Sequence, residues 1–169
     1  MQEDGNHVVA VLSAMGDATD ELLRLAHDVS PAPLPRELDL LVTTGARISC
    51  ALTAMALIDL GRRAVSLTGS QAGIVTDEAH GSATILEVRP HRIERELLVG
   101  AIVLVANHQG VSTASEVTAL EQANAGATAT AIASALGAGR CELVDGDPSV
   151  EGIDLGSSPV DPLRLQHAM

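Results

Sequence analysis

The hydrophobic residues of this chain gather in short continuous runs that are separated by longer stretches with helical spacing. Short apolar runs rich in β-branched residues are typical of buried strands. The run Ala101–Val105 (AIVLV) is apolar throughout, as expected of a strand that is covered on both faces. We predict strands at five places: His7–Leu12, Ala64–Leu67, Ser82–Val88, Ala101–Val105 and Cys141–Val144.

Helical patterns occupy most of the intervals between these runs. Thr19 or Asp20 is placed to cap the first helix, and Gly61 to end the third. The loop Ser30–Pro35 contains three prolines, which cannot continue a helix. A break is predicted at Thr43–Gly45. The predicted helices are Glu21–Val29, Arg36–Val42, Ala46–Leu60, Arg92–Leu98 and about Leu120–Leu136.

This alternation of strands and helices predicts an α/β fold with three layers, α/β/α, around a mostly parallel sheet. The composition changes at Asp145, where the sequence DGDPSVEGIDLGSSPVDP has the character of a loop. We therefore expect one α/β domain over residues 1–144. Residues 145–169 are expected to form a C-terminal tail that is either flexible or covers the cleft.

Composition excludes several classes of partner. The 169 residues include no Phe, Tyr or Trp, so bases of single-stranded nucleic acid have no ring to stack on. The net charge of −12 repels phosphate backbones and anionic lipids. The longest apolar runs, Ala51–Leu60 and Leu97–Ala106, are too short or interrupted to span a membrane. We expect neither nucleic acid nor membrane as a partner.

The two cysteines, Cys50 and Cys141, lie far apart and form no metal-type pair. The first residues, MQEDGNH, are polar and acidic, unlike a signal peptide. Both features favour a reduced, cytoplasmic protein. Cys50 falls on an apolar helix face and is expected to be buried.

Several ordered segments resemble the aspartokinase branch of the amino acid kinase family, over roughly residues 8–142. The first of them, VVAVLSAMGDATDELLRLA, is close to the family pattern V-V-V-S-A-M-G-x-T-T-D-x-L. The resemblance implies an amino acid kinase-like fold, truncated here. The family's opening strand and K-x-G-G-T-S loop, and its regulatory domains, have no counterpart in this sequence. The other matching segments are Ser30–Leu57, Ser66–Thr76, His80–Ile85, Ala101–Ser112 and Val117–Ala138.

The same segments depart from the family pattern where its chemistry resides. In the family loop V-T-T-L-G-R-G-G-S-D-T-T-A-V-A, the arginine falls on Gln122, the serine on Ala125 and the aspartate on Gly126. The glutamate that holds substrate in the family is Ala46. The nucleotide motif T-D-V-D-G is replaced after Val144. Phosphoryl transfer depends on such charged groups. The resemblance therefore predicts a kinase-dead homologue.

The polar residues in the former cleft suggest other chemistry. The family's G-F-Q-G reads Asn107, His108, Gln109, Gly110. His108 is a candidate general acid or base near neutral pH, or a loop histidine without a role. Asn107 is a candidate oxyanion donor or a turn residue. Arg47 is placed to clamp a carboxylate, or is a structural arginine. The candidate substrate-binding residues are Ser13, Thr19, Thr44, Arg47, Gln109 and Gln122.

The alternative roles of Ser13 and Thr19 are a turn at a strand end and a helix cap. Asp77, Glu78 and His80 form a D-E-x-H cluster. They are neighbouring loop residues without a distant partner, so we predict no metal site and no cofactor.

Two main functions remain open at this stage, beside a third, a binding module that keeps only affinity for an amino acid. The first is an enzyme repurposed for a non-redox proton-transfer reaction on a small metabolite, such as a cyclisation, isomerisation, elimination or addition. Arginine exceeds lysine and the chain is rich in Ala, Gly and Asp, which favours a high-GC bacterium and specialised biosynthesis. The second is a non-catalytic partner or regulatory subunit of an aspartokinase or a biosynthetic enzyme. The resemblance also implies a homodimer, paired through the early helices.

Overall fold

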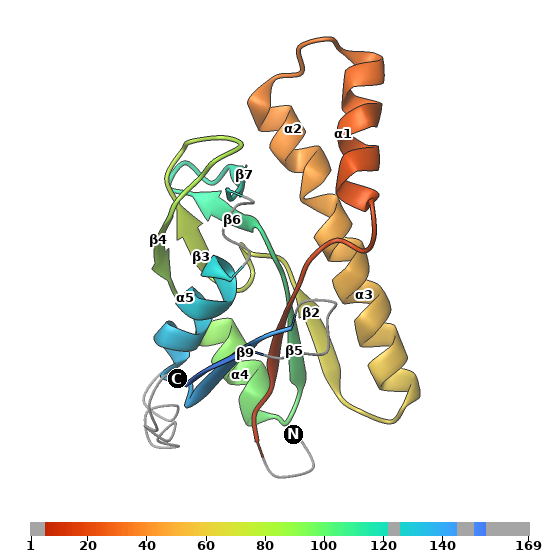
Figure 1. Cartoon of the computed structure of the whole chain (residues 1–169). Coiled ribbons are helices and arrows are strands. Elements are labelled where there is room, and N and C mark those ends of the chain that lie inside the picture. Colours follow the sequence, from red (N-terminus) through yellow and green to blue (C-terminus); the bar gives the residue numbers. More distant parts are fainter. Residues whose placement is uncertain (1–5, 122–125, 145–150, 155–169) are drawn as a thin grey trace.

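The computed structural model describes residues 6–121, 126–144 and 151–154. Its central sheet has three parallel strands in the order β1-β5-β2 (Figure 1). These strands span Val9–Leu12 (β1), Ala64–Leu67 (β2) and Ile102–Ala106 (β5). Each was predicted from its apolar run to within two residues. Because β5 lies in the middle, both of its faces are buried, as its continuous apolar sequence requires.

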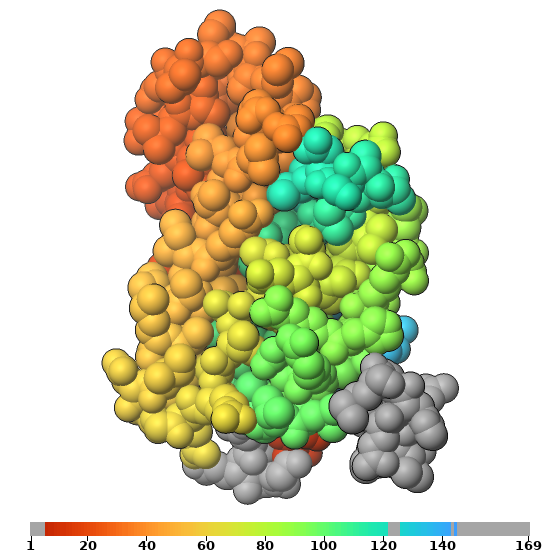
Figure 2. All heavy atoms as spheres, turned by 180° about the vertical axis from the view of Figure 1, so that it is seen from behind, coloured from red at the N-terminus to blue at the C-terminus, as the bar shows by residue number. Residues whose placement is uncertain are grey.

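The helices occupy both faces of this sheet and one end of the molecule. Helices α1 and α2 form a hairpin that projects beyond the sheets, and α3 runs along one side (Figures 1 and 2). The five helices are α1 (Ala18–Val29), α2 (Pro35–Val42), α3 (Thr44–Asp59), α4 (His91–Leu98) and α5 (Ala127–Leu136).

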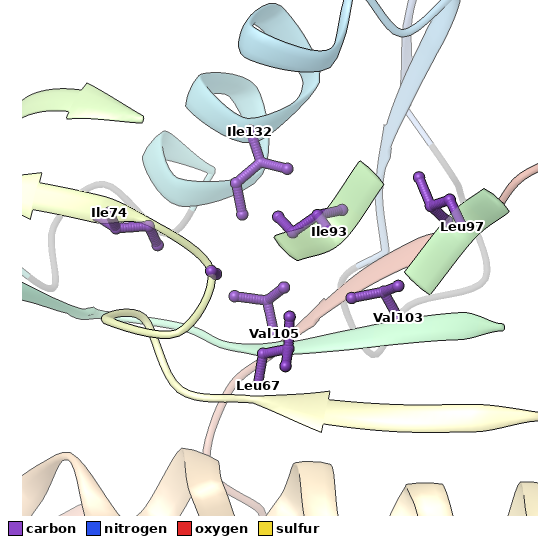
Figure 3. Close-up of a cluster of buried hydrophobic side chains, with 8 residues drawn as sticks. Leu67, Ile74, Ile93, Leu97, Val103, Val105 and Ile132 are labelled. Atoms are coloured by element: carbon purple, nitrogen blue, oxygen red, sulfur yellow. The ribbon is translucent and has the colours of Figure 1, made fainter. Parts of the chain in front are cut away.

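Successive residues of β5 face opposite layers. Val103 and Val105 pack into a cluster with Ile93 of α4 and Ile132 of α5 (Figure 3). The residues between and after them, Leu104 and Ala106, pack against Ala46, Cys50 and Ala54 of α3. The period-2 alternation of strand side chains thus produces the three-layer α/β/α architecture that the sequence predicted. Small residues on the inner face of α3 let it approach the sheet closely.

A second sheet, in the order β4-β3-β6-β7, lies beyond the carboxyl ends of the central strands. The pair β3 and β6 is parallel, and the outer pairs are antiparallel. Of these strands only β4 was predicted; the others have three or four residues with polar or glycine positions. Their bounds are Ile74–Thr76 (β3), Ile85–Val88 (β4), Gln109–Ser112 (β6) and Val117–Ala119 (β7).

A short antiparallel pair joins β8 (Arg140–Leu143) to β9 (Glu151–Asp154). β8 matches the predicted strand at Cys141–Val144. β9 lies in the stretch for which the composition predicted loop structure, so that prediction is wrong for Glu151–Asp154. The composition gave the wrong prediction because a strand of four residues can form from such a sequence when a neighbouring strand provides backbone hydrogen bonds. β8 is that neighbouring strand.

Several predicted helix ends are wrong. The N-cap of α1 is Asp17, and its side chain makes no capping hydrogen bond, so Thr19 and Asp20 lie inside the helix. The break between α2 and α3 is confined to Thr43. Leu120 is not helical: it bridges to Ala83 in parallel fashion, because the preceding residues extend β7.

The helical stretch Pro35–Asp59 is long and apolar enough to cross a membrane by length and composition alone. The prediction that no apolar segment reaches this length is therefore wrong, since it treated α2 and α3 as separate runs. About 33% of the most apolar window is buried against the rest of the protein. Core helices of folded domains pass the same test.

Cys50 is buried in the α3 layer, as predicted, and burial raises the pKa of its thiol to about 11. A thiol with that pKa is almost entirely protonated at neutral pH. Cys50 therefore acts as a small apolar packing residue.

Candidate functional site

The central strands end together at one edge of the sheet, and polar residues follow each of them. Ser13 follows β1, Thr68 follows β2 and Asn107 follows β5. The carboxyl ends of parallel strands are where open α/β sheets place their sites. This edge also faces the start of the second sheet, because β6 begins only two residues after Asn107.

Asn107 holds the ends of β1 and β5 together. Its backbone N–H donates to the Leu12 carbonyl at 2.9 Å. Its side-chain Nδ2 donates to Ser13 Oγ at 3.1 Å, and its Oδ1 accepts the His108 N–H at 2.8 Å. Asn107 is buried, whereas Ser13 is exposed. The structure thus brings together the predicted residues Ser13, Asn107 and His108.

His108 is fixed in an unusual backbone conformation. Its φ of 53° lies in the left-handed region, which costs a residue with a Cβ about 1 kcal/mol. The backbone is held there by the bond to Asn107 and by the Leu120 N–H, which donates to the His108 carbonyl at 3.0 Å. The imidazole is half-buried, and burial lowers its pKa below the usual 6.5. At neutral pH the ring is therefore uncharged and able to accept a proton.

Gln109 links α3 to this edge. Its side chain is 1% exposed. Its Oε1 accepts from Arg47 Nε at 3.0 Å and from the Gly69 N–H at 3.4 Å. Its Nε2 donates to the Thr43 carbonyl at 3.0 Å. These contacts make Gln109 a positioning residue for Arg47; direct ligand binding by Gln109 stays a prediction.

Sequence reasoning missed Thr43 and Gly69. A Cβ at Gly69 would lie 2.0 Å from the Gln109 carbonyl oxygen, so only glycine allows this approach. Thr43 was read only as part of a helix break. Both partners were hidden because they lie far from Gln109 in the sequence.

Within the described part of the chain, the positively charged guanidinium of Arg47 contacts only neutral groups. Besides Gln109, its guanidinium donates from Nη2 to Thr43 Oγ1 at 3.2 Å. Among the described residues no carboxylate lies within ion-pair distance of Arg47, and burial lowers its pKa. Arginine still remains charged at neutral pH. A half-buried cation of this kind favours an incoming anion, most of all a carboxylate that accepts two N–H groups.

The remaining predicted residues are less well placed or cannot be placed. The Thr44 hydroxyl, at the start of α3, donates to the Leu41 carbonyl in the last turn of α2 at 2.6 Å. Thr19 lies in the first turn of α1, half-buried. Gln122 lies outside the described residues. The ligand contacts of these three residues stay predictions.

The D-E-x-H cluster points its three side chains in different directions. Asp77 Oδ1 accepts the N–H groups of Ala79 and Thr84 at 3.2 and 3.1 Å. Glu78 accepts from Thr113. Within the described ranges, no group of three or more potential metal ligands comes together.

His80 of this cluster has a distant partner that the sequence did not reveal. His80 Nδ1 lies 2.7 Å from Asp39 Oδ2, and Asp39 Oδ1 accepts the Gly81 N–H at 3.0 Å. Asp39 is buried, on α2. The contacts therefore fasten the loop between β3 and β4 to that helix.

The state of His108 predicts a contribution to the pH dependence of stability. Because its pKa is lowered in the folded state, the unfolded chain takes up this proton first as the pH falls. We expect His108 to lower the free energy of unfolding as the pH drops below about 6.5. The free energy of unfolding is measured by urea unfolding followed by far-UV circular dichroism. In His108→Asn it should fall less steeply with decreasing pH than in the wild-type chain. An unchanged slope would contradict the lowered pKa.

Comparison with known proteins shows the family to which the chain belongs. The family model described as "Amino acid kinase family" matches residues 1–153. Aspartokinase of Mycobacterium tuberculosis is 54% identical over 149 residues, covering 86% of this chain and 35% of that protein. Aspartokinase of Mycolicibacterium smegmatis is 56% identical over 146 residues, covering 84% of this chain and 35% of that protein. The chain thus spans about 35% of the length of these relatives.

Solved structures give the same answer for the fold. The aspartate kinase from Synechocystis superposes with a TM-score of 0.67 at 40% identity, covering 83% of this chain and 23% of that one. E. coli aspartokinase III, in complex with lysine and aspartate, gives a TM-score of 0.66 at 19% identity. That match covers 82% of this chain and 42% of the E. coli chain. The predicted fold class is confirmed.

Proposed function

Because this chain belongs to the amino acid kinase family, and within it is related to aspartokinases, we propose that its cleft serves a reaction other than phosphoryl transfer. The proposed reaction is a proton transfer on a small metabolite that carries a carboxylate. Arg47 binds the carboxylate, and the neutral imidazole of His108 takes the proton. Base-catalysed cyclisations, isomerisations, eliminations and additions use such a step.

The observation that carries this proposal is the pairing of Asn107 and His108 at the carboxyl end of β5. A histidine in a left-handed conformation is retained there at a cost in stability, where the family pattern has phenylalanine. Asn107 fixes its backbone, and burial keeps the ring neutral. Strained residues persist where the surrounding structure holds them and are frequent at active sites.

The surroundings of Ala46, which occupies the position of the family's glutamate, support the absence of kinase chemistry. Ala46 packs with Leu104 and Ala106 in the apolar cluster beneath α3. No charged group therefore stands at position 46 to hold an amino acid ammonium or a phosphoryl group. Removing one electrostatic group from such a site typically costs about 3 kcal/mol of transition-state stabilisation. The changes at Gln122, Ala125 and Gly126 add to this loss.

We expect no phosphoryl transfer from Mg-ATP to aspartate. Release of ADP should stay at the rate of an enzyme-free control, and Mg-ATP should leave the melting temperature unchanged. Melting is followed by far-UV circular dichroism, because the chain has no aromatic reporter. A ligand at 100 times its dissociation constant would stabilise the protein by about 2.7 kcal/mol. ADP release that depends on aspartate would overturn the proposal.

The proton-transfer role is tested with metabolite fractions of a bacterial extract, screened first for a rise in melting temperature. With a ligand found in this way, turnover is measured for His108→Asn, which tolerates the left-handed backbone but removes the base. We expect a loss of about 10²–10⁴-fold. His91→Asn, at an exposed ring on α4, is the matched control. Full activity in His108→Asn would remove His108 from the mechanism. If no metabolite fraction raises the melting temperature, the result favours the alternative that the chain is a non-catalytic partner or regulatory subunit.

A further inference from the structure

Arg47 differs from most arginines of this chain in the groups that it contacts. The sequence has 22 acidic and 10 basic residues, so an arginine on the surface has many carboxylates to pair with. Arg47 is half-buried and, in the described part of the chain, donates only to the neutral groups of Gln109 and Thr43. An anionic ligand would therefore reach this guanidinium without displacing a carboxylate of the described residues. The arginines that do pair with a carboxylate are Arg24, Arg36, Arg89, Arg95 and Arg140.

The two contacts of Arg47 occupy one edge of its guanidinium. Nε donates to Gln109 Oε1 at 3.0 Å, and Nη2 donates to Thr43 Oγ1 at 3.2 Å. A guanidinium is planar and carries five N–H groups. The end edge, which Nη1 and Nη2 form, still has N–H groups to donate. A carboxylate binds such an edge through two parallel hydrogen bonds. Because Gln109 and Thr43 fix the other edge, the end edge is held in one orientation.

The side chains that follow β1 and β5 at this edge of the sheet are neutral. Asn107 Nδ2 donates to Ser13 Oγ at 3.1 Å, so the Ser13 hydroxyl keeps its own proton for another acceptor. The His108 imidazole is uncharged at neutral pH, because burial lowers its pKa. These groups form hydrogen bonds with a hydroxyl or carbonyl group of a ligand. They provide no negative charge to balance an ammonium group.

The wall beside these residues is apolar. Ala46 is 6% exposed and packs with Leu104 and Ala106, and Ala106 directly precedes Asn107. An ammonium group at this wall would lose its water without gaining a negative partner, and an unpaired charge is costly to bury. A neutral hydroxyl or carbonyl group loses much less on the same transfer. The wall and the neutral side chains therefore disfavour a ligand that carries an ammonium group.

We propose that the site takes carboxylates that lack an ammonium group, namely 2-hydroxy and 2-oxo acids, and rejects amino acids. This inference rests on the proposed function, because it names the substrate class of the same site. Arg47 binds the carboxylate through its end edge. Ser13 and His108 face the hydroxyl or oxo oxygen with neutral groups.

A 2-oxo acid also suits the proposed proton transfer. His108 takes a proton from the carbon next to the oxo group, so a C–H bond breaks and an N–H bond forms. The electron pair of the C–H bond moves toward the oxo oxygen, which becomes the oxygen of an enolate. The Ser13 hydroxyl, which Asn107 orients, donates a hydrogen bond to that oxygen.

The net charge of −12 opposes this selectivity at long range, because it attracts cations. Screening at 0.1 M salt weakens interactions between exposed charges beyond about 10 Å. A carboxylate on Arg47 lies within hydrogen-bond distance of a half-buried cation, where screening is weaker. The contact with Arg47 therefore decides which class of ligand binds.

Titration calorimetry of the full chain with matched pairs of acids tests the selectivity. The two members of a pair share a carbon skeleton and differ by an ammonium or a hydroxyl group. The pairs are alanine with lactate, aspartate with malate, and glutamate with 2-hydroxyglutarate, each in the same configuration. We expect at least one hydroxy acid to bind, and to bind about 10-fold or more tightly than its amino acid. Equal or tighter binding of the amino acids would overturn the proposal, and so would a lack of binding by every hydroxy acid.

Two variants test the assignment of the carboxylate to Arg47. Arg47→Gln removes the cation, and Gln109→Glu keeps the arginine but places a carboxylate against it. Each should weaken binding of the hydroxy acid by about 30-fold or more. The control is Arg95→Gln, which changes an exposed arginine on α4 and should leave the affinity unchanged. Far-UV circular dichroism checks that the variants are folded. Unchanged affinity in a folded Arg47→Gln or Gln109→Glu chain would overturn the assignment.

These results separate the ligand class from the reaction. Selective binding of hydroxy acids, with full activity in His108→Asn, would overturn the reaction proposed for His108 and support the ligand class. Turnover of an amino acid that is lost in His108→Asn would support the reaction and overturn the ligand class.

Discussion

Replacing Gly73 by alanine should lower the free energy of unfolding by about 4 kcal/mol. Gly73 has a φ of 83°, and a Cβ there would lie 1.9 Å from the carbonyl oxygen of Arg89. The Gly73 carbonyl also accepts the Arg89 N–H at 2.9 Å, so the two backbones are held in contact where β3 meets β4. Alanine would add left-handed strain and force this edge of the second sheet apart.

The matched control for this change is Gly61→Ala. Gly61 has a nearly equal φ of 77°, but a Cβ there would meet nothing within 4 Å. Only the conformational strain remains, so a loss of about 1 kcal/mol is expected. Both variants are compared by urea unfolding. Equal losses of stability in the two variants would mean that the Arg89 backbone lies farther from Gly73 than it does in the structure.

Replacing Asp39 by alanine should lower the free energy of unfolding by about 3 kcal/mol. The carboxylate of Asp39 is buried and bonds both His80 and the Gly81 N–H. Removing it leaves the Gly81 N–H and a histidine nitrogen without the buried acceptor that they share, which costs more than the bonds themselves. The loop between β3 and β4 would then detach from α2.

Two further variants separate this effect from a general loss of charge. Asp39→Asn keeps an acceptor for Gly81 and should lose about half as much stability. Asp28→Ala removes the exposed partner of Arg24 on α1 and should change stability by less than about 1 kcal/mol. A similar result for Asp39→Ala and Asp28→Ala would contradict a structural role for the Asp39–His80 contact.

These two predictions concern the second sheet, and that sheet sets the geometry of the candidate site. β6 begins at Gln109, immediately after His108, and Leu120 at the end of β7 donates to the His108 carbonyl. Separation of β3 from β4, or of the loop between β3 and β4 from α2, would therefore disturb the positions of His108 and Arg47. We infer that the second sheet acts as the rigid support on which the site residues are held.

Some residues at the carboxyl edge of the central sheet could be selected from the sequence, but their contacts could not. Asn107, His108 and Arg47 stand out in the sequence because they replace or adjoin positions of a recognised motif. The role of Gln109 was not visible, because its partner Arg47 lies 62 residues away. His80 was grouped with its sequence neighbours, although its partner Asp39 lies 41 residues away. Spacing along the chain does not report contacts that tertiary folding creates.

The sequence by itself determined the central sheet and the helices on its faces, because long apolar runs gain stability only when they are buried. It also determined the family, since many ordered motifs survive. Tertiary structure alone decided the second sheet, whose strands are too short and polar to form without partners. It also decided the left-handed backbone of His108 and the neutral hydrogen-bond partners of Arg47, Thr43 and Gln109. These features depend on hydrogen bonds and burial supplied by distant segments, which no local pattern encodes.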